Sequence, residues 1–192
     1  NSSNSLLNQK NQSINGSVKE ALRLGCSAVG FTIYPGSEYQ YDMMEEFKEI
    51  SREATEHGLP SVLWSYPRGP NITKEDETSI DVIGYAAHIA AQLGAHIIKV
   101  KPPTENISKN ELKKTYQDND IIISKLSSRI NHIKKCAFSG KRIVVFSGGN
   151  AKSQEELFEE IKNIRDGNGN GSIIGRNTFQ RPKSEALKML NN

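Results

Sequence analysis

One pattern repeats along the chain from residue 17 onward: a short apolar, β-branched segment, a turn containing Pro or Gly, and an amphipathic helix. Apolar residues in the helical segments recur at three- and four-residue spacing, as in helices with one buried face. Strands that alternate with helices form parallel sheets, so the pattern predicts an α/β fold. We expect strands at 28–34, 61–66, 95–101, 141–147 and 172–175, and helices at 17–24, 37–57, 77–93, 110–138, 152–165 and toward the C-terminus around 186–190.

Composition narrows the possible classes of protein. The 192 residues are 35% apolar and 24% charged, which is typical of one globular domain, and an eight-stranded α/β barrel usually needs about 250 residues. We divide the chain into a polar lead-in at 1–16, rich in Asn and Ser, and a single domain at 17–192. A net charge of +3 does not indicate nucleic-acid binding, and no apolar run approaches the roughly 20 residues of a membrane span.

Two cysteines, Cys26 and Cys136, stand far apart, and neither they nor the four histidines have the spacing of metal ligands. We therefore predict a reduced, cytoplasmic protein without a metal or cofactor.

The third apolar segment, 95–101, carries two lysines. Side chains alternate between the two faces of a strand, so Lys99 and Lys101 share one face. A lysine in such a strand is either a solvated residue at the strand end or an amine in a low-dielectric cavity. Burial would lower its pKa and make it a nucleophile toward carbonyl groups. The segment alone leaves both interpretations open.

Other candidate residues follow the remaining strands, where parallel α/β proteins gather their functional groups. Trp64 and Tyr66 share a face at the end of the strand 61–66. Either both aromatic side chains pack on a neighbouring helix, or the Tyr66 phenol lies near the lysine amine. Two glycine-containing turns follow the last two predicted strands, and such turns before helices can bind phosphate or serve only as turns. The turns contain Ser147, Gly148 and Gly149, and Gly175 with Arg176.

Five motifs taken together, in order over about residues 17–190, resemble the archaeal-type class I fructose-bisphosphate aldolases, which also occur in bacteria. The motifs are Ala28-Val29-Gly30-Phe31-Thr32-Ile33-Tyr34, Leu63-Trp64-Ser65-Tyr66-Pro67-Arg68-Gly69, Gly94-Ala95-His96-Ile97-Ile98-Lys99, Phe146-Ser147-Gly148-Gly149 and Ile174-Gly175-Arg176-Asn177.

The resemblance implies a (β/α)8 barrel, that is, a TIM barrel, in which a lysine forms a Schiff base with the substrate ketone and no metal takes part. Counted backward from an eighth strand, the five expected strands become strands four to eight. Lys99 then matches the Schiff-base lysine on strand six, and Tyr66 matches the proton-transfer tyrosine on strand five. Trp64 matches an active-site tryptophan, and the phosphate-binding candidates are Ser147, Gly148, Gly149, Lys152, Gly175 and Arg176.

The implied reaction is the reversible cleavage of fructose 1,6-bisphosphate into dihydroxyacetone phosphate and glyceraldehyde 3-phosphate, a step of glycolysis and gluconeogenesis. It implies a homo-oligomer that binds a sugar phosphate and neither nucleic acid nor membrane. Strands one to three of the family, and an aspartate on its first strand, have no counterpart here, so we expect the chain to be part of a longer protein. Two alternatives stay open: a Schiff-base aldolase or transaldolase-type enzyme acting on another sugar phosphate, and a catalytically idle phosphosugar-binding fragment.

Overall fold

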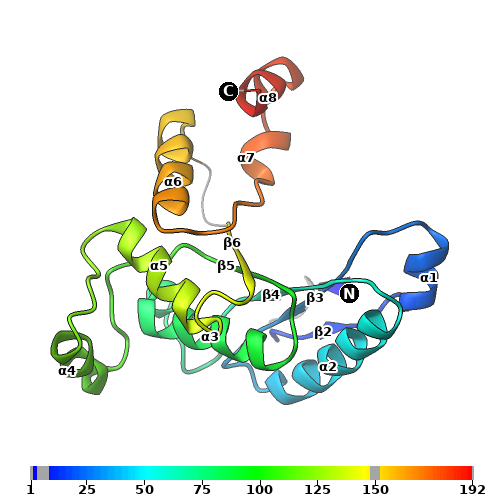
Figure 1. Cartoon of the computed structure of the whole chain (residues 1–192), viewed down its shortest axis with the longest axis horizontal. Helices are drawn as coiled ribbons and strands as arrows, with labels where there is room; N and C mark the ends of the chain where they lie inside the picture. The colour runs from blue at the N-terminus through cyan, green and yellow to red at the C-terminus, as the bar shows by residue number, and fades with distance from the viewer. Residues whose placement is uncertain (1, 4–8, 148–151, 192) are drawn as a thin grey trace.

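The computed structural model describes residues 2–3, 9–147 and 152–191 (Figure 1). Its strands are β1 (Ser2–Ser3), β2 (Gln12–Ser13), β3 (Val29–Ile33), β4 (Ser61–Ser65), β5 (Ile97–Val100) and β6 (Ile143–Phe146). Its helices are α1 (Val18–Arg23), α2 (Gln40–Glu56), the 3-10 turn η1 (Asp76–Thr78), α3 (Ile80–Gln92), α4 (Asn110–Asp118), α5 (Leu126–Cys136), α6 (Gln154–Asp166), α7 (Arg176–Phe179) and α8 (Lys183–Leu190). None of the helices in the described part of the chain is long and apolar enough to cross a membrane.

Four parallel strands form the central sheet in the order β3-β4-β5-β6, which is also their order in the sequence. The prediction of parallel strands alternating with helices is therefore confirmed for this part of the chain. A capping box begins the first helix: Ser17 Oγ accepts the Glu20 backbone N–H at 3.1 Å, and the Glu20 carboxylate accepts the Ser17 N–H at 2.7 Å.

The two faces of the sheet have different surroundings. One face packs against α2 and α3, and α3 packs in turn on α5. The strand side chains on this face are fully or almost fully buried: Phe31, Ile33, Leu63, Ile98, Val100, Val144 and Phe146. They form one apolar core with Phe47, Ile83 and Ile133 from the helices. Burial of this core is the main force that fixes the helices on the sheet.

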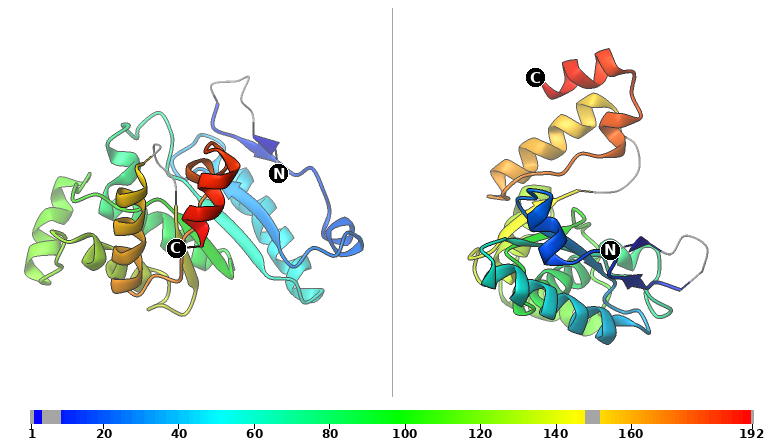
Figure 2. Two further views of the ribbon diagram at one scale, coloured as in Figure 1. Left: turned by 90° about the horizontal axis from the view of Figure 1, so that it is seen from above. Right: turned by 90° about the vertical axis from the view of Figure 1, so that its right-hand side faces the viewer.

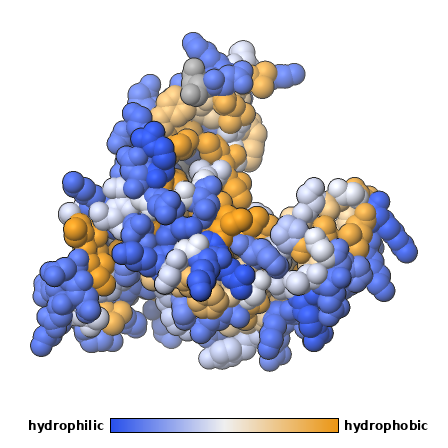
Figure 3. Space-filling model, in the orientation of Figure 1, coloured by the Kyte–Doolittle hydropathy of each residue, from blue (hydrophilic) through white to orange (hydrophobic). Residues whose placement is uncertain are grey.

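The opposite face is only partly covered in the described residues. Gly30 is exposed, Thr32, Val62, Trp64 and Val145 are half-buried, and Ile143 is 45% exposed. Figures 1 and 2 show α6, α7 and α8 standing apart from α2 and α3. Apolar surface runs upward from the strands between α6 and α7 in the space-filling view (Figure 3).

Three parts of the chain differ from the expected elements. The segment 172–175 forms no strand and makes only one bridge, between Ser172 and Phe146. The expected helix 110–138 is two helices, because Asp120 has a φ of 50° and the Ile121 N–H bonds to Tyr116 O, which ends α4. The C-terminal helix expected around 186–190 is present as α8, but a short helix that was not expected, α7, precedes it.

The polar lead-in contains a short antiparallel pair, β1 with β2. It is fixed to the end of β3 by two side-chain bonds. Ser37 Oγ donates to Lys10 O at 2.6 Å, and Gln12 Nε2 donates to the Tyr34 hydroxyl at 2.8 Å. The lead-in therefore lies beside the loop that follows β3.

The loops that follow β3 and β4 touch through their backbones. The Arg68 N–H donates to Pro35 O at 3.0 Å, and a Cβ at Gly69 would lie 1.7 Å from Gly36 O. Only a residue without a side chain allows this approach at position 69. The contact fixes Arg68, and the residues around it, against the neighbouring strand end.

We expect Gly69→Ala to lower the free energy of unfolding by about 1–3 kcal/mol, because the two loops must separate to admit the methyl group. Gly16→Ala is the matched control, since a Cβ there would lie 3.8 Å from Glu20 Oε2, an ordinary contact. Urea denaturation followed by circular dichroism measures both. Equal stability of the two variants would contradict the tight approach of the loops.

Candidate active site

The centre of the candidate site is one row of side chains across the sheet. Trp64 of β4 is paired in register with Thr32 of β3 on one side and with Lys99 of β5 on the other. Lys99 is paired in turn with Val145 of β6. Paired residues on adjacent strands point to the same face. The row therefore lies on the partly covered face, opposite the packed core.

The Lys99 ammonium lies over the Trp64 indole. Its Nζ is 5.4 Å from the ring centroid, and the residue is 9% exposed. Burial lowers the pKa of the Lys99 amine below its ordinary value, because removal from water disfavours the charged form. Of the two interpretations that the sequence leaves open, the structure supports the buried amine. A larger neutral fraction of the amine favours addition to a carbonyl carbon.

The indole is placed by a residue that the sequence analysis did not single out for the site. A Cβ at Gly30 would lie 2.8 Å from Trp64 Cζ3, so the missing side chain on β3 leaves room for the ring. The signal available in the sequence was a glycine inside a strand, which often marks a close approach by another group.

Tyr66 lies directly after β4, where its backbone N–H donates to Ile33 O at 3.1 Å. Burial raises the pKa of its phenol to about 12, and Tyr34 acts in the same direction, while the charges of Arg68 and Arg176 oppose the rise. The phenol is therefore protonated at neutral pH and can donate a proton.

The predicted phosphate-binding residues are only partly described. Gly148 and Gly149 lie outside the described residues. Ser147 is buried, its N–H donates to Val100 O at 3.0 Å, and its hydroxyl donates to Ile173 O. These bonds hold the segment before Gly175 and Arg176 against the end of β6. Gly175 precedes α7, whose first residue is the exposed Arg176.

Lys152 is fixed between two helices. Its ammonium is paired with Glu160 of α6, and its backbone N–H donates to Asn177 Oδ1 of α7 at 2.9 Å. Its carbonyl oxygen accepts from Arg181 Nη2 at 3.0 Å. The structure thus brings Lys152 next to α7, with its charge held by a carboxylate.

Arg68 and Lys101 share the Glu77 carboxylate. Lys101 Nζ lies 2.7 Å from Glu77 Oε2, and Arg68 Nε lies 4.0 Å from the same oxygen. Arg68 also stacks on Tyr34, with Cζ 5.5 Å from the ring centroid. Glu77 was not identified from the sequence. It lies in η1 and not directly after a strand, and nothing in the sequence indicates that it is close to Lys101, 24 residues further along the chain. In the described residues, no group of three or more His, Cys, Asp and Glu side chains is arranged to hold a metal ion.

Comparison with known proteins gives consistent matches. A family profile described as DeoC/LacD family aldolase matches residues 1–181. The chain is 36% identical over 175 residues to the "Fructose-bisphosphate aldolase class 1" of Thermoproteus tenax, covering 91% of this chain and 56% of that protein. It is 34% identical over 176 residues to a "Fructose-bisphosphate aldolase/6-deoxy-5-ketofructose 1-phosphate synthase" of Methanocaldococcus jannaschii, covering 91% of this chain and 49% of that protein.

Among solved structures, the chain is similar to an archaeal fructose-1,6-bisphosphate aldolase with the catalytic Lys covalently bound to the carbinolamine intermediate of the substrate. The TM-score is 0.77 at 35% identity, and the match covers 96% of this chain and 64% of that one. The chain thus spans about half the length of the curated relatives described above, 56% and 49%.

Trp64 is the single tryptophan of the chain and can report on the charge of Lys99. We expect its emission to change with pH as the ammonium over the ring loses its proton. The midpoint should lie below the ordinary lysine pKa of about 10.4, because burial lowers the pKa of Lys99. Fluorescence titration of the wild type measures this, with Tyr66→Phe as a control for phenol ionisation. A transition that persists unchanged in Lys99→Met would contradict the assignment.

Proposed function

Because the chain belongs to the DeoC/LacD family of aldolases, we propose that it carries the Schiff-base site of a class I fructose-bisphosphate aldolase. The observation that carries the proposal is the buried Lys99 amine, with its lowered pKa, beside Trp64 on one face of a parallel sheet. Tyr66 directly follows the strand that carries Trp64, and it retains its proton at neutral pH. The relatives named for this activity support the same role.

The proposed reaction begins when the neutral amine of Lys99 adds to the C2 ketone of fructose 1,6-bisphosphate. Loss of water from the carbinolamine gives an iminium ion. The C3–C4 bond then breaks, its electron pair moves toward the iminium nitrogen, and the C4 hydroxyl loses its proton as glyceraldehyde 3-phosphate leaves. Protonation of the remaining enamine at C3, followed by hydrolysis, releases dihydroxyacetone phosphate and restores the amine. The iminium ion is the electron sink in this sequence.

Tyr66 is the proposed proton carrier for the carbinolamine and enamine steps. A phenol with a pKa of about 12 donates a proton readily only to a basic oxygen or carbon, such as those that form in these steps. The charges of Arg68 and Arg176 stabilise the phenolate that is left after donation. Trp64 would cover the substrate beside Lys99.

One phosphate of the substrate is assigned to the turns beyond β6. Ser147, Gly148, Gly149, Gly175 and Arg176 are the proposed contacts, with Lys152 as a supporting charge. The bond from Ser147 to Ile173 supports this assignment, because it holds the two turns together. A phosphate bound there would hold the ketone carbon next to the Lys99 amine, so that part of the binding energy is used to orient the reacting atoms.

We also propose that residues 17–192 are one domain in which β3 to β6 correspond to strands four to seven of a (β/α)8 barrel, and 172–175 to strand eight. The partly covered sheet face supports this proposal. In a barrel that face lies inside, where side chains from all strands fill the interior. The exposed Ile143 and Gly30 on this face are the features expected of an interior surface that further strands would cover.

The second candidate function is aldol chemistry on a 6-deoxy ketose 1-phosphate. The similarity to the Methanocaldococcus jannaschii protein favours it, because the name of that protein includes this activity. Lys99 and Tyr66 would act identically on either substrate. Relative turnover of a ketose 1,6-bisphosphate and a ketose 1-phosphate separates the two candidates.

Borohydride reduction in the presence of dihydroxyacetone phosphate tests the Schiff base. We expect one reduced adduct on the peptide that contains Lys99, and none in Lys99→Met, since methionine has no amine. Lys101→Met is the matched control and should still be labelled. Intact mass and peptide mapping measure the adduct. Labelling of Lys99→Met at the wild-type level would disprove the role of Lys99.

Tyr66→Phe should reduce kcat by roughly 10²- to 10⁴-fold, the usual contribution of a positioned acid or base. Labelling by borohydride should persist, because the amine is retained. Tyr41→Phe, on the exposed surface of α2, should keep wild-type turnover. A steady-state assay of bisphosphate cleavage measures all three proteins. Wild-type kcat in Tyr66→Phe would exclude the phenol from proton transfer.

A further inference from the structure

Three side chains with donor atoms converge between α4 and α5, and we call them the Tyr-His-Cys site: Tyr116, His132 and Cys136. His132 Nε2 lies 3.1 Å from the Tyr116 hydroxyl oxygen and 3.8 Å from Cys136 Sγ. His132 and Cys136 are four residues apart on α5, so their side chains share one face of the helix. Tyr116 comes from α4 and packs against the imidazole, with the ring centroids 5.3 Å apart. This Cys–His spacing was not recognised from the sequence.

Packing against α3 sets the position of the sulfur atom. A Cβ at Gly84 of α3 would lie 3.2 Å from Cys136 Sγ, so the missing side chain leaves room for the thiol. His88, on the same helix, fixes the adjacent backbone, because its Nδ1 donates to Cys136 O at 3.0 Å. Tyr116 is 8% exposed, and His132 and Cys136 are half-buried. The donor atoms are therefore held in place without being closed off from solvent.

The charges in the site favour a cation between the three donors. Burial raises the pKa of the Tyr116 phenol, and the negative charges of the Cys136 thiolate and of Asp81 raise that pKa further. Burial also raises the pKa of the Cys136 thiol. Burial and the charge of Lys135 lower the pKa of His132, so its imidazole is neutral at neutral pH, the form that binds a metal ion. A dication would offset the cost of ionising the buried thiol, since a coordinated thiol is deprotonated.

The spacing of the donor atoms fits tetrahedral zinc coordination. Usual zinc–sulfur and zinc–nitrogen bond lengths place these two donors about 3.5–3.6 Å apart at a tetrahedral angle, and a nitrogen and an oxygen donor about 3.3 Å apart. The corresponding distances here are 3.8 Å and 3.1 Å. Small side-chain rotations would therefore bring all three donors to one ion.

An open hollow of about 690 Å³ gives access to the site. His132 and Cys136 line it, together with two carboxylates and one ammonium group, those of Asp120, Asp166 and Lys135. The excess of carboxylates favours the approach of a cation. The hollow also leaves room for water in the fourth coordination position.

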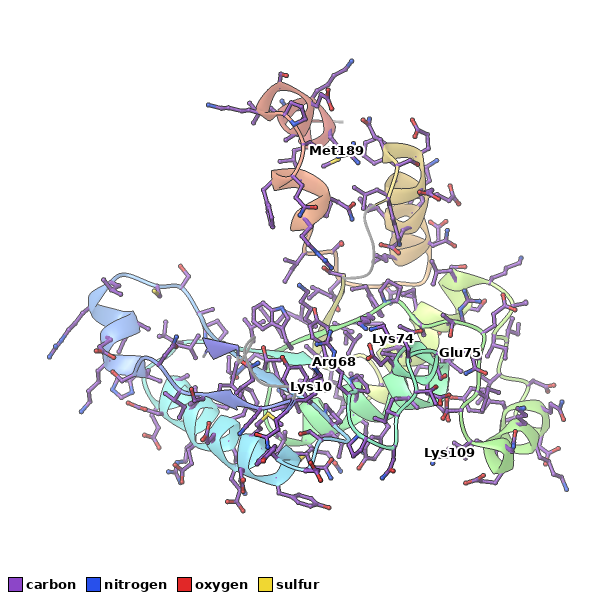
Figure 4. The ribbon with its side chains drawn as sticks, turned by 180° about the vertical axis from the view of Figure 1, so that it is seen from behind. Lys10, Arg68, Lys74, Glu75, Lys109 and Met189 are labelled. Atoms are coloured by element: carbon purple, nitrogen blue, oxygen red, sulfur yellow. The ribbon has the colours of Figure 1, made fainter. Side chains whose placement is uncertain are left out.

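The Tyr-His-Cys site is separate from the candidate active site. α5 packs on α3, and α3 packs on the core face of the sheet, whereas Lys99 and Trp64 lie on the opposite face. Figure 4 shows Lys109, the residue before α4, apart from Arg68, which follows β4. An ion in this site would therefore take no part in the chemistry at Lys99.

We propose that Tyr116, His132 and Cys136 form a binding site for Zn²⁺. The imidazole nitrogen, the thiolate sulfur and the phenol oxygen each donate a lone pair to the ion, and water completes the coordination. The thiol proton passes to solvent when the sulfur binds. Imidazole and thiolate donors select zinc over Mg²⁺, which prefers oxygen ligands. The bound ion joins α4 to α5, the two helices of the connection between β5 and β6.

Binding of Co²⁺ and Zn²⁺ to the whole chain tests the proposal, with the protein kept reduced and freed of metal by a chelator beforehand. Co²⁺ on a thiolate gives a charge-transfer band in the near ultraviolet, and Zn²⁺ removes this band by competition. We expect the wild type to bind one ion per chain, and Mg²⁺ not to compete.

Cys136→Ser, His132→Gln and Tyr116→Phe should each weaken Zn²⁺ binding at least about tenfold, because loss of even an outer-shell partner usually costs 10- to 100-fold. Cys26→Ser is the matched control, since Cys26 is the other free cysteine and is exposed. It should bind Zn²⁺ as the wild type does. Circular dichroism of the metal-free proteins shows whether each is folded, and Tyr116→Phe retains the ring that packs in the core.

Three results would overturn the proposal. The first is that the wild type binds no Zn²⁺. The second is unchanged affinity in any of the three variants of the Tyr-His-Cys site. The third is loss of binding in Cys26→Ser, which would assign the ion to the exposed thiol.

Discussion

The indole of Trp64 and the amine of Lys99 are neighbours because β4 and β5 pair in one particular register. A slip of one residue would turn Lys99 into the apolar core and bring Ile98 or Val100 onto the opposite face. The core fixes that register, since Leu63 and Ile98 are fully buried against the helices in the adjacent row. The pairing of Trp64 with Lys99 on one face of the sheet is thus a consequence of packing on the other face.

Two lysines two residues apart have opposite surroundings. Lys101 lies 2.7 Å from the Glu77 carboxylate, which stabilises its charge. Lys99 lies over an indole, and in the described residues it forms no ion pair. Desolvation therefore lowers the pKa of Lys99, whereas the positive charge of Lys101 is balanced by a partner. The two lysines at this strand end therefore differ in their surroundings: one amine is desolvated, and the other is paired with a carboxylate.

The regular parts of the fold follow from local pattern, and the irregular parts do not. Apolar periodicity places β3 to β6 within one or two residues at most ends, and the Ser17–Glu20 capping box is evident from residue types alone. The segment 172–175 has the composition of a strand. Its Ile173 carbonyl oxygen, however, accepts a hydrogen bond from the Ser147 hydroxyl, and the segment forms only one bridge, between Ser172 and Phe146. The break in the expected helix 110–138 depends on a left-handed residue, Asp120, that periodicity does not mark.

The candidate site shows the same division. Lys99, Trp64 and Tyr66 are candidates from the sequence because they lie at the ends of neighbouring predicted strands, and the structure brings Lys99 and Trp64 together. Gly30 and Glu77 are not, since each acts through a contact between elements that the sequence does not reveal. The missing side chain of Gly30 leaves room for the Trp64 indole. Glu77 pairs with cations from two other segments, Arg68 after β4 and Lys101 after β5.

The order of the strands in the sheet is their order along the chain. Each new strand can therefore pair with the strand made just before it, while its helix covers the growing core. Assembly in the direction of synthesis needs no earlier strand to be displaced, and contacts between successive units span only short stretches of sequence, which limits the entropy lost on closing each loop. The indole of Trp64 on β4 is therefore already present in the chain when β5 brings Lys99 beside it.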